Sequence, residues 1–408
     1  MKHRGDLAFA AFFLLVLAAI VGVLVRVNMG PAKPKEPDIQ VMPFPAEMVP
    51  FPWAGQLWPQ ALVKVPVWSA EDSRYHPLAS LDRTHILVQE IDGSTGAFSL
   101  LRLDTTTNTT TRLGEMPKTK DLTGHQILAA RVDARSIVWY LTAATAGGAT
   151  HQGEFWLMPR LGTEAAGKAT LLATIDDVPA DIAPRFAITD ETIVWSSANG
   201  LRRIPLSGGD DEEFPGTMGL HLQDWPWASR DAGVVNVLTG EAHLFPKLTQ
   251  VTLGCGPRWC VGKDHGSRVV VQSTDGKRYA RLPAWVTAPL GLVSQRYLLL
   301  RTTPPANNPA GSRAPSSIAY DLDTGQVGTL MTKWGNAPVL GDGGVNLGLG
   351  DGLAYWASPD RATHPPKSDA KRQLVDSAAA FAMAHQGADA FFGVPEKFWL
   401  LNFAALGS

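Results

Sequence analysis

Short runs of β-branched and aromatic residues, separated by tight-turn sequences, recur along most of the chain. The pattern is clearest where three extended segments follow one another, Ile193–Ser196, Leu201–Leu206 and Glu212–Pro215, with Asn-Gly at 199–200 and Ser-Gly-Gly-Asp at 207–210 between them. Such turns supply the positive φ that a tight hairpin needs. β-Branched and aromatic residues suit a pleated sheet. The pattern therefore predicts a meander of short antiparallel strands.

The same unit repeats from Pro77 to the end of the chain, and we count seven copies. An apolar strand is predicted at His85–Ile91, Ser136–Thr142, Ile193–Ser196, Trp225–Ser229, Arg258–Gly262, Arg296–Thr302 and Leu353–Ala357. A second strand follows at Phe98–Leu103, Phe155–Pro159, Leu201–Leu206, Val234–Leu238, Arg268–Ser273, Ile318–Leu322 and Lys397–Asn402, and a third follows in several copies, for example at Thr110–Leu113 and Val327–Met331. Seven units give about 47 residues each, near the ~40–50 expected of propeller blades.

A lone meander cannot bury both of its faces, so neighbouring units must stack, and closing the ring leaves only short sheet edges. No helical period persists between Pro77 and Pro359. A β-sandwich of this size would not repeat one phrase seven times. We therefore expect an all-β fold, a single β-propeller of seven blades, with six or eight as the alternative counts.

The last blade departs from the repeat in two ways. Ser368–Gln386 has a helical pattern, with Ser368 as N-cap and Gly387 as stop, and predicts a helical insertion. After Lys397–Asn402 the chain ends too soon for another full strand. We therefore expect Ala61–Val65 to pair with Lys397–Asn402 as the outermost strand, because an open edge would expose unpaired backbone groups.

An uncharged apolar run, Leu7–Val25, lies near the N-terminus. Nineteen helical residues extend about 28 Å, close to the ~30 Å hydrocarbon core of a bilayer. A cleaved signal peptide is the alternative, but no small-x-small site follows the run. The expected domains are a membrane anchor at 1–27, a Pro-rich spacer at 28–59 and the propeller at 60–408. Basic residues flank the run on both sides, so charge does not settle its orientation.

Composition narrows the range of partners. The net charge is −2, with acidic and basic residues interspersed, so no basic face predicts a nucleic-acid partner. The thirteen Trp outnumber the six Tyr, and several Trp lie in the middle of predicted strands. We expect their rings to fill the space between neighbouring sheets.

Cys255 and Cys260 are the only cysteines. A redox pair usually has the spacing C-x-x-C, and a zinc site needs four ligands, with only His265 nearby in sequence. A structural disulfide is the favoured interpretation, with Cα atoms about 4.4–6.8 Å apart. A disulfide implies an oxidising compartment. It therefore predicts a cytoplasmic N-terminus and an extracytoplasmic propeller in the cell membrane.

Other candidate sites have simpler explanations. The Gly-rich stretch Gly341–Gly352 lacks the nucleotide-binding patterns and is expected to be an inner strand and corner where backbones approach closely. The acids of Ser207–Glu213 are expected to be solvated at a hairpin tip rather than to bind calcium. Three histidines, His76, His125 and His221, precede or begin inner segments and are candidates to line a central channel.

Some chemistry is excluded and some is left open. The chain has no G-x-S-x-G motif, which excludes a hydrolase of that type. No histidine pair has metal-binding spacing. Paired carboxylates for glycosidic chemistry need not be close in sequence, so spacing does not test them. No catalytic, metal or cofactor residue is therefore assigned.

Three segments give a resemblance to a known family. The anchor followed by Trp58–Pro66, the phrase Tyr75-His-Pro-Leu78 and the phrase Leu100-Leu-Arg-Leu-Asp104 resemble the TolB-like β-propeller proteins of bacterial envelopes. The resemblance covers roughly residues 58–408 and lies in the texture of the repeats, without a diagnostic motif. It implies a propeller that binds other proteins at one of its ends.

The expected function is that of a membrane-anchored, extracytoplasmic propeller without enzymatic activity, which binds or scaffolds other envelope proteins. Its partners are the membrane, through the N-terminal helix, and an unidentified envelope protein. Two alternatives remain. A cluster of Asp, Glu or His from three or more blades, converging at one mouth, would favour a glycosidase or lyase acting in the central funnel. A deep pocket lined by Trp would favour a small-ligand sensor.

Overall fold

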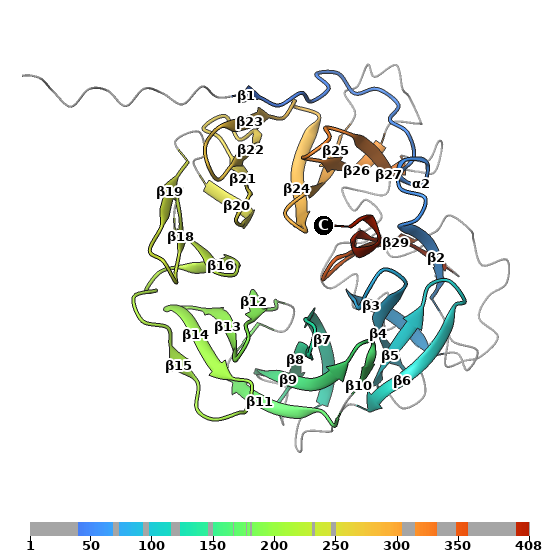
Figure 1. Ribbon diagram of the computed structural model, residues 1–408, viewed down its shortest axis with the longest axis vertical. Coiled ribbons are helices and arrows are strands. Elements are labelled where there is room, and N and C mark those ends of the chain that lie inside the picture. Colours follow the sequence, from blue (N-terminus) through green and yellow to red (C-terminus); the bar gives the residue numbers. More distant parts are fainter. Residues whose placement is uncertain are drawn as a thin grey trace, which may run out of the picture.

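A computed structural model shows seven antiparallel sheets arranged as blades around a common axis (Figure 1). It describes residues 40–67, 73–92, 98–115, 123–145, 150–165, 167–176, 178–179, 182–230, 233–245, 250–303, 315–332, 348–357 and 397–407. The predicted all-β propeller is confirmed, and the blade count is seven. Almost no helix is present in the described part of the chain.

Each blade is a meander whose first strand lies nearest the axis. Blades 1 and 2 contain β3 (Arg74–Ser80), β4 (His85–Ile91), β5 (Phe98–Asp104) and β6 (Thr109–Glu115), then β7 (Thr123–Val132), β8 (Ser136–Ala144), β9 (His151–Leu161), β10 (Glu164–Ala165) and β11 (Thr170–Ile175). Blades 3 and 4 contain β12 (Phe186–Ile188), β13 (Thr192–Ser197), β14 (Gly200–Pro205) and β15 (Glu212–Glu213), then β16 (His221–Asp224), β17 (Trp227–Arg230), β18 (Gly233–Asn236) and β19 (Ala242–Leu244).

The last three blades follow the same order. Blade 5 contains β20 (Gln250–Cys255), β21 (Trp259–Lys263), β22 (Val269–Ser273) and β23 (Arg278–Arg281), with β1 (Gln40–Val41) added at its outer edge. Blade 6 contains β24 (Val286–Val293), β25 (Tyr297–Thr302), β26 (Pro315–Asp321) and β27 (Val327–Thr332). Blade 7 contains β28 (Gly348–Gly350), β29 (Leu353–Ala357), β30 (Lys397–Asn402) and β2 (Leu62–Pro66).

The predicted strands are the second, third and fourth strands of each blade, and the innermost strand was missed in most blades. The innermost strands pair irregularly with their neighbours. Register shifts interrupt β3 at Pro77, β7 after Ile127 and β24 at Pro289. A bulge breaks the two-residue alternation of buried and exposed side chains, which is the signal that sequence analysis uses to find a strand.

The hydrophobic core is divided among the blade junctions. The buried apolar residues of the described chain form seven clusters, one between each pair of neighbouring blades. Trp rings contribute to several of these clusters: Trp139 and Trp156 stack between blades 1 and 2, and Trp195 packs against Phe155 between blades 2 and 3. The prediction that Trp fills the space between sheets is confirmed.

Residues 40–61 lie against the outside of blades 5, 6 and 7 and form a belt (Figure 1). β1 pairs in parallel with β23. Phe44 packs edge-on against Tyr320 with 4.9 Å between ring centroids, and the hydroxyl of Tyr320 donates to the carbonyl of Pro43 at 3.0 Å. The short helix α2 (Ala54–Leu57) then leads into β2. The part of the predicted spacer from residue 40 onward is thus packed on the propeller.

The ring is closed at the junction of blades 7 and 1 by two separate contacts. At the outer edge, β2 pairs with β30 over its whole length, from Leu62 opposite Leu401 to Pro66 opposite Lys397. This confirms the closure predicted from the sequence. At the inner edge, the amide of Ser80 donates to the carbonyl of Asp351 at 2.7 Å, and β28 and β3 thereby come into contact.

Gly350 explains how closely these inner strands approach. A Cβ at this position would lie 2.4 Å from the carbonyl oxygen of Leu78, so only glycine fits. The expectation that the Gly-rich stretch is an inner strand and corner holds for its described part, residues 348–352.

Several predicted features lie outside the described residues. These are the apolar run Leu7–Val25, the helical insertion Ser368–Gln386 and most of the inner segment expected at Pro338–Gly348. Among the described residues, no helix has the length and apolar character needed to cross a membrane.

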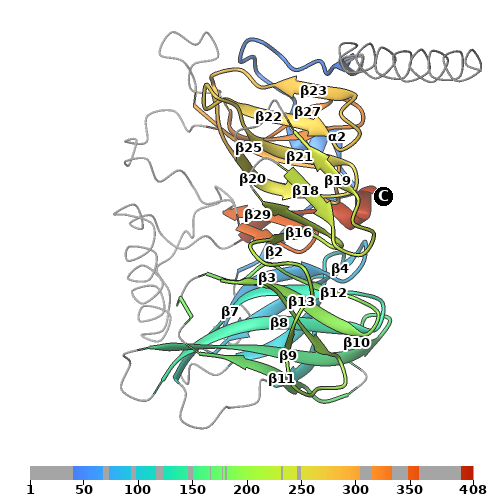
Figure 2. The same ribbon diagram turned by 90° about the vertical axis from the view of Figure 1, so that its left-hand side faces the viewer.

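The two ends of the ring differ. At one end, here called the turn end, the first strand of each blade joins the second and the third joins the fourth. At the opposite end, here called the link end, the second strand joins the third and one blade passes to the next. The C-terminal turn η2 (Phe403–Leu406) lies at the turn end (Figure 2).

Aspartate side chains fix the connections at the turn end. Asp82 accepts hydrogen bonds from the amides of Thr84 and His85 at 2.7 and 2.8 Å. Asp133 does the same for Arg135 and Ser136 at 2.8 and 2.6 Å. Such Asx turns replace backbone pairing at a corner, so the turn end is built from short, fixed turns.

Candidate functional site

Polar side chains from several blades meet near the ring axis. Arg131, near the end of β7, forms an ion pair with Asp351 of blade 7, with 3.0 Å between Nη1 and Oδ1. Its Nε donates to the carbonyl of Phe186 in blade 3 at 3.3 Å. The amide of Val132 donates to the other oxygen of Asp351 at 3.3 Å. Arg131, which lies in blade 2, is therefore held in place by groups from blades 3 and 7.

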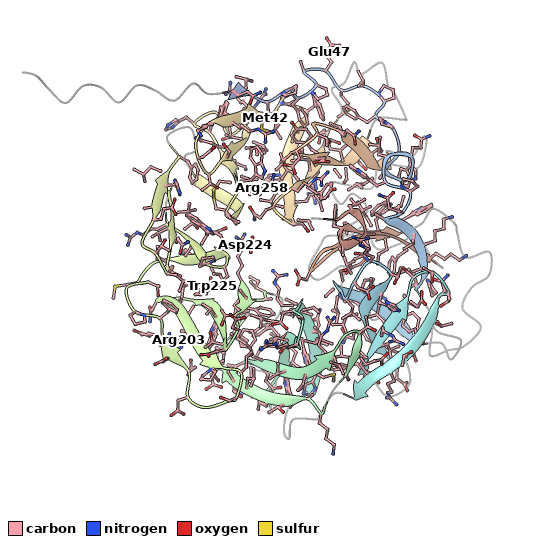
Figure 3. The ribbon with its side chains drawn as sticks, in the orientation of Figure 1. Met42, Glu47, Arg203, Asp224, Trp225 and Arg258 are labelled. Atoms are coloured by element: carbon pink, nitrogen blue, oxygen red, sulfur yellow. A yellow bond between two sulfur atoms is a disulfide. The ribbon has the colours of Figure 1, made fainter. Side chains whose placement is uncertain are left out.

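Asp224, the last residue of β16, faces this group from blade 4 (Figure 3). Asp224 as a whole residue is exposed, but the protein around its carboxyl group displaces water from that group. This desolvation raises the pKa of Asp224 above its usual value. The positive charge of Arg131 and a hydrogen bond from Gln295 oppose the increase, whereas the charge of Asp351 adds to it. Asp224 and Asp351 thus influence each other across the axis.

Arg185, just before β12, completes the group. Its Nη1 donates to Oε1 of Gln223, and Nε2 of Gln223 donates to Ser229 Oγ at 2.5 Å. Burial, and then the like charge of Arg131, lower the pKa of Arg185. In the described part of the chain no carboxylate forms an ion pair with Arg185. We call Arg131, Arg185, Asp224 and Asp351 the axial cluster.

A second polar group lies at the junction of blades 7 and 1. His76 of β3 meets Tyr355 of β29 edge-on, with ring centroids 5.8 Å apart and 3.4 Å between Nε2 and the hydroxyl. Burial, reinforced by the charge of Arg74, lowers the pKa of His76 to about 4. Burial also raises the pKa of Tyr355. His76 is therefore neutral at pH 7 and cannot serve there as a cation.

Lowering the pH from 7 to 4.5 is expected to destabilise the wild-type protein more than a His76→Gln variant. The folded-state pKa is about 4, against ~6.5 for an unfolded chain, so between these values the unfolded chain binds a proton that the folded protein excludes. The titration of His76 therefore leaves the free energy of unfolding unchanged above pH ~6.5. As the pH falls toward 4, it lowers the free energy of unfolding by at most about 3 kcal/mol.

Urea unfolding midpoints at the two pH values measure this difference. His221→Gln is the matched control, because His221 also lies on an innermost strand but is exposed. Equal pH dependence in the wild type and His76→Gln would show that another group causes the acid sensitivity.

The three histidines singled out from the sequence all lie on innermost strands, as expected, in β3, β7 and β16. The structure does not bring them together. His76 contacts Tyr355, and the ring of His125 lies 6.2 Å from that of Phe98. Among the described residues, no group of three His, Cys, Asp or Glu side chains could hold a metal ion.

The acidic hairpin tip is occupied by ion pairs. Arg202 pairs with Asp211 at 2.5 Å, and Arg203 pairs with Glu212 at 2.7 Å. These neighbours on β14 neutralise acids that would otherwise attract a cation. The geometry therefore gives no support to a calcium site.

Cys255 and Cys260 form a disulfide in the structure. Their Cα atoms are 4.2 Å apart, just below the expected range. Both residues are fully buried in the cluster between blades 4 and 5. The pair closes the turn between β20 and β21 and packs there with apolar side chains.

Sequence reasoning missed the axial cluster. Its members come from the end of β7, the residue before β12, the end of β16 and the corner after β28, and no local motif joins them. The only available signal was a charged residue within or beside an innermost strand. That signal was hidden because those strands were not recognised.

No protein-family model and no curated protein sequence matches the chain. Several solved structures resemble it. An uncharacterised protein of Listeria monocytogenes matches with 10% identity and a TM-score of 0.38, over 63% of this chain and 82% of that one. TolB from Acinetobacter baumannii matches with 18% identity and a TM-score of 0.31, over 50% of this chain and 52% of TolB.

The acylaminoacyl peptidase of Pyrococcus horikoshii matches with 12% identity and a TM-score of 0.39, over 70% of this chain and 51% of the peptidase. The chain thus spans about half the length of the TolB and peptidase chains. TolB is among the similar structures, as the texture of the repeats predicts. Each of these TM-scores is below 0.5, so the likenesses carry no argument about function.

Proposed function

We propose that this protein is a non-enzymatic binding module of the cell envelope, anchored in the membrane by Leu7–Val25, which engages a partner protein at the link end of its propeller. The observation that carries the proposal is the difference between the two ends of the ring. The turn end consists of short corners fixed by aspartates such as Asp82 and Asp133. The link end also has short corners, such as the one that Asp264 fixes between β21 and β22, but it carries in addition the connections at 303–314 and 358–396.

Two features of the link end support its role in binding. Residues 303–314 join β25 to β26, and residues 358–396 join β29 to β30, so both connections begin and end there. Ile182 and Met218, in the links before blades 3 and 4, are 61% and 82% exposed. Exposed apolar side chains on a rigid scaffold are typical of protein-interaction surfaces. The turn end also carries two, Leu161 (79%) and Leu238 (62%), so the experiment below compares the two ends directly.

The path of the belt supports the orientation. The amide of Gln40 donates to the carbonyl of Lys277 at 2.6 Å, which places the start of the described chain at the turn-end corner of blade 5. Residues 26–39 would separate this corner from the anchor and can span at most about 50 Å. With the turn end on the membrane side, the link end faces away from the membrane.

The disulfide between Cys255 and Cys260 supports an extracytoplasmic location, because such bonds persist in oxidising compartments.

The axial cluster supports binding over catalysis. It holds two carboxylates from two blades, fewer than the acids or histidines from three or more blades that would favour the glycosidase or lyase alternative. Arg131 and Asp351 neutralise each other rather than activating a nucleophile.

Site-specific photo-crosslinking in intact cells tests the proposal. A benzophenone side chain is placed at Met218 at the link end or at Leu238 in the last turn of blade 4 at the turn end. These positions are matched, because both are apolar, exposed (82% and 62%) and adjacent to the same blade. We expect a discrete protein adduct from position 218 and none from position 238.

An adduct from position 238 alone would place binding at the wrong end. Protease added to intact spheroplasts tests the location separately, and we expect it to remove the propeller. Full protection of the propeller would contradict the orientation, and a mature N-terminus near Met29 would contradict the anchor.

A further inference from the structure

Arg185 carries a charge that the described protein does not neutralise. The only hydrogen-bond acceptor assigned to its guanidinium is the neutral amide of Gln223. Arg131, whose charge acts on Arg185, has the same sign, and burial adds to the cost of the charge. A desolvated charge without a counter-ion is unfavourable, and proteins rarely retain one without a use for it.

Part of the Arg185 guanidinium also remains available to bind a ligand. Nη1 is used by Gln223, which fixes the group, while Nε–H and both Nη2 protons have no assigned acceptor in the described part of the chain. Nε and Nη2 together form the planar fork that binds a carboxylate through two parallel hydrogen bonds. Gln223 is itself held by Ser229, so the fork is supported by a second residue.

We infer that Arg185, assisted by the positive charge of Arg131, binds a carboxylate group at the axis of the ring. The neighbouring acids determine the charge of the ligand. Asp351 already offsets Arg131, and Asp224 lies opposite. A dianion such as phosphate would be repelled by these two carboxylates, whereas a monoanion replaces the missing counter-ion of Arg185. The ligand is therefore a monoanion, and the planar fork of Nε and Nη2 fits a carboxylate, which accepts two parallel hydrogen bonds.

The inference deepens the proposed function and rests on it only for the source of the ligand, a carboxylate presented by the bound partner. The site itself can be tested on the purified full-length protein in detergent. Acetate is the probe, and chloride at the same ionic strength is the reference. At ten times its half-saturating concentration, acetate is expected to raise the Tm by about 2 °C, in a saturable manner.

Three variants separate binding from a structural role. Arg185→Gln is expected to lose the acetate effect and, in acetate-free buffer, to raise the Tm by about 1–3 °C, because it removes an uncompensated charge. Arg185→Lys keeps the charge but not the fork and should retain only a small part of the effect. Arg203→Gln on β14 of the same blade removes an arginine already paired with Glu212 and should respond to acetate like the wild type.

The outcomes are distinct. An equal response to acetate in the wild type and Arg185→Gln would overturn the site. A fall in the Tm of Arg185→Gln in acetate-free buffer would assign Arg185 a structural role instead. If Arg185→Gln does not fold, Arg185→Lys decides, and an undiminished acetate effect in that variant would reject bidentate binding. If acetate does not bind but position 218 gives a crosslink, the carboxylate site is rejected and the proposed function stands. If acetate binds but position 218 gives no crosslink, partner binding at the link end is rejected and the carboxylate site stands.

Discussion

Removal of residues 1–66 is expected to abolish the folded propeller, whereas removal of residues 1–39 leaves it intact. The longer deletion removes β2, so β30 loses its partner from Leu401 to Lys397 and blade 7 ends in an open edge. It also removes Ala61 and Val65, each only 1% exposed, from the cores on either side of blade 7. Circular dichroism and urea unfolding measure the result.

A matched pair of substitutions separates loss of the strand from loss of chain length. Val65→Asp places a carboxylate in the core between blades 7 and 1 and is expected to cost about 4 kcal/mol or more. Val41→Asp makes the same change on β1, where the side chain is 71% exposed, and should change stability by less than about 0.5 kcal/mol. Equal unfolding midpoints for the two variants would contradict the role of β2 in closing the ring.

The belt changes one expectation drawn from the sequence. The sequence predicts a Pro-rich spacer at 28–59, and such a spacer should tolerate deletion of residues 30–50. Met42 and Met48 are each 5% exposed in the cluster between blades 5 and 6, and Phe44 packs on Tyr320. Deletions that extend past residue 40 should therefore already lower stability.

Asn402→Ala is expected to destabilise the protein by about 3 kcal/mol. The side chain is 2% exposed at the junction of blades 7 and 1. Its Oδ1 accepts from Ser80 Oγ at 2.9 Å and from the amide of Ala404 at 3.1 Å. Its Nδ2 donates to the carbonyls of Asp82 and Arg83 at 2.8 and 3.2 Å. Truncation leaves these buried partners without their hydrogen bonds.

Asn402→Asp should be more destabilising than Asn402→Ala, because it turns a donor toward two carbonyl oxygens into an acceptor and adds a buried charge. Asn199→Ala, in an exposed turn of blade 3, is the control and should have little effect. Urea unfolding ranks the three variants. If Asn402→Ala matches Asn199→Ala, hydrogen bonding by Asn402 does not hold this junction closed.

The parts of the fold that sequence predicted are those with regular alternation. β4, β8 and β25 are long, apolar and bounded by turns, and they were found close to their true ends. The closure by β2 was also accessible, because blade 7 lacked a fourth strand and the segment before blade 1 had a strand pattern. The innermost strands were not accessible, since bulges at Pro77 and Pro289 break the alternation.

The candidate site was beyond sequence reasoning for a different reason. Arg131 and Asp351 are separated by 220 positions and meet only because seven blades close into a ring. Arg185 belongs to no sequence motif. Its significance lies in the lack of an acidic partner among the residues that the structure describes, which is a property of the packed structure. The sequence shows which charged residues exist, but which of them lack an oppositely charged partner is decided by the fold.

The closure by β2 has a consequence for biosynthesis. β2 is translated near the start of the chain, whereas its partner β30 is translated near the end. At ~5–20 residues per second the ribosome needs roughly 20–60 s to make the segment between them. During that time β2 has no partner, and Lys64 and Pro66 are residues that discourage an exposed edge from pairing with other chains. Ring closure therefore comes late, after the strands of all the other blades have been synthesised.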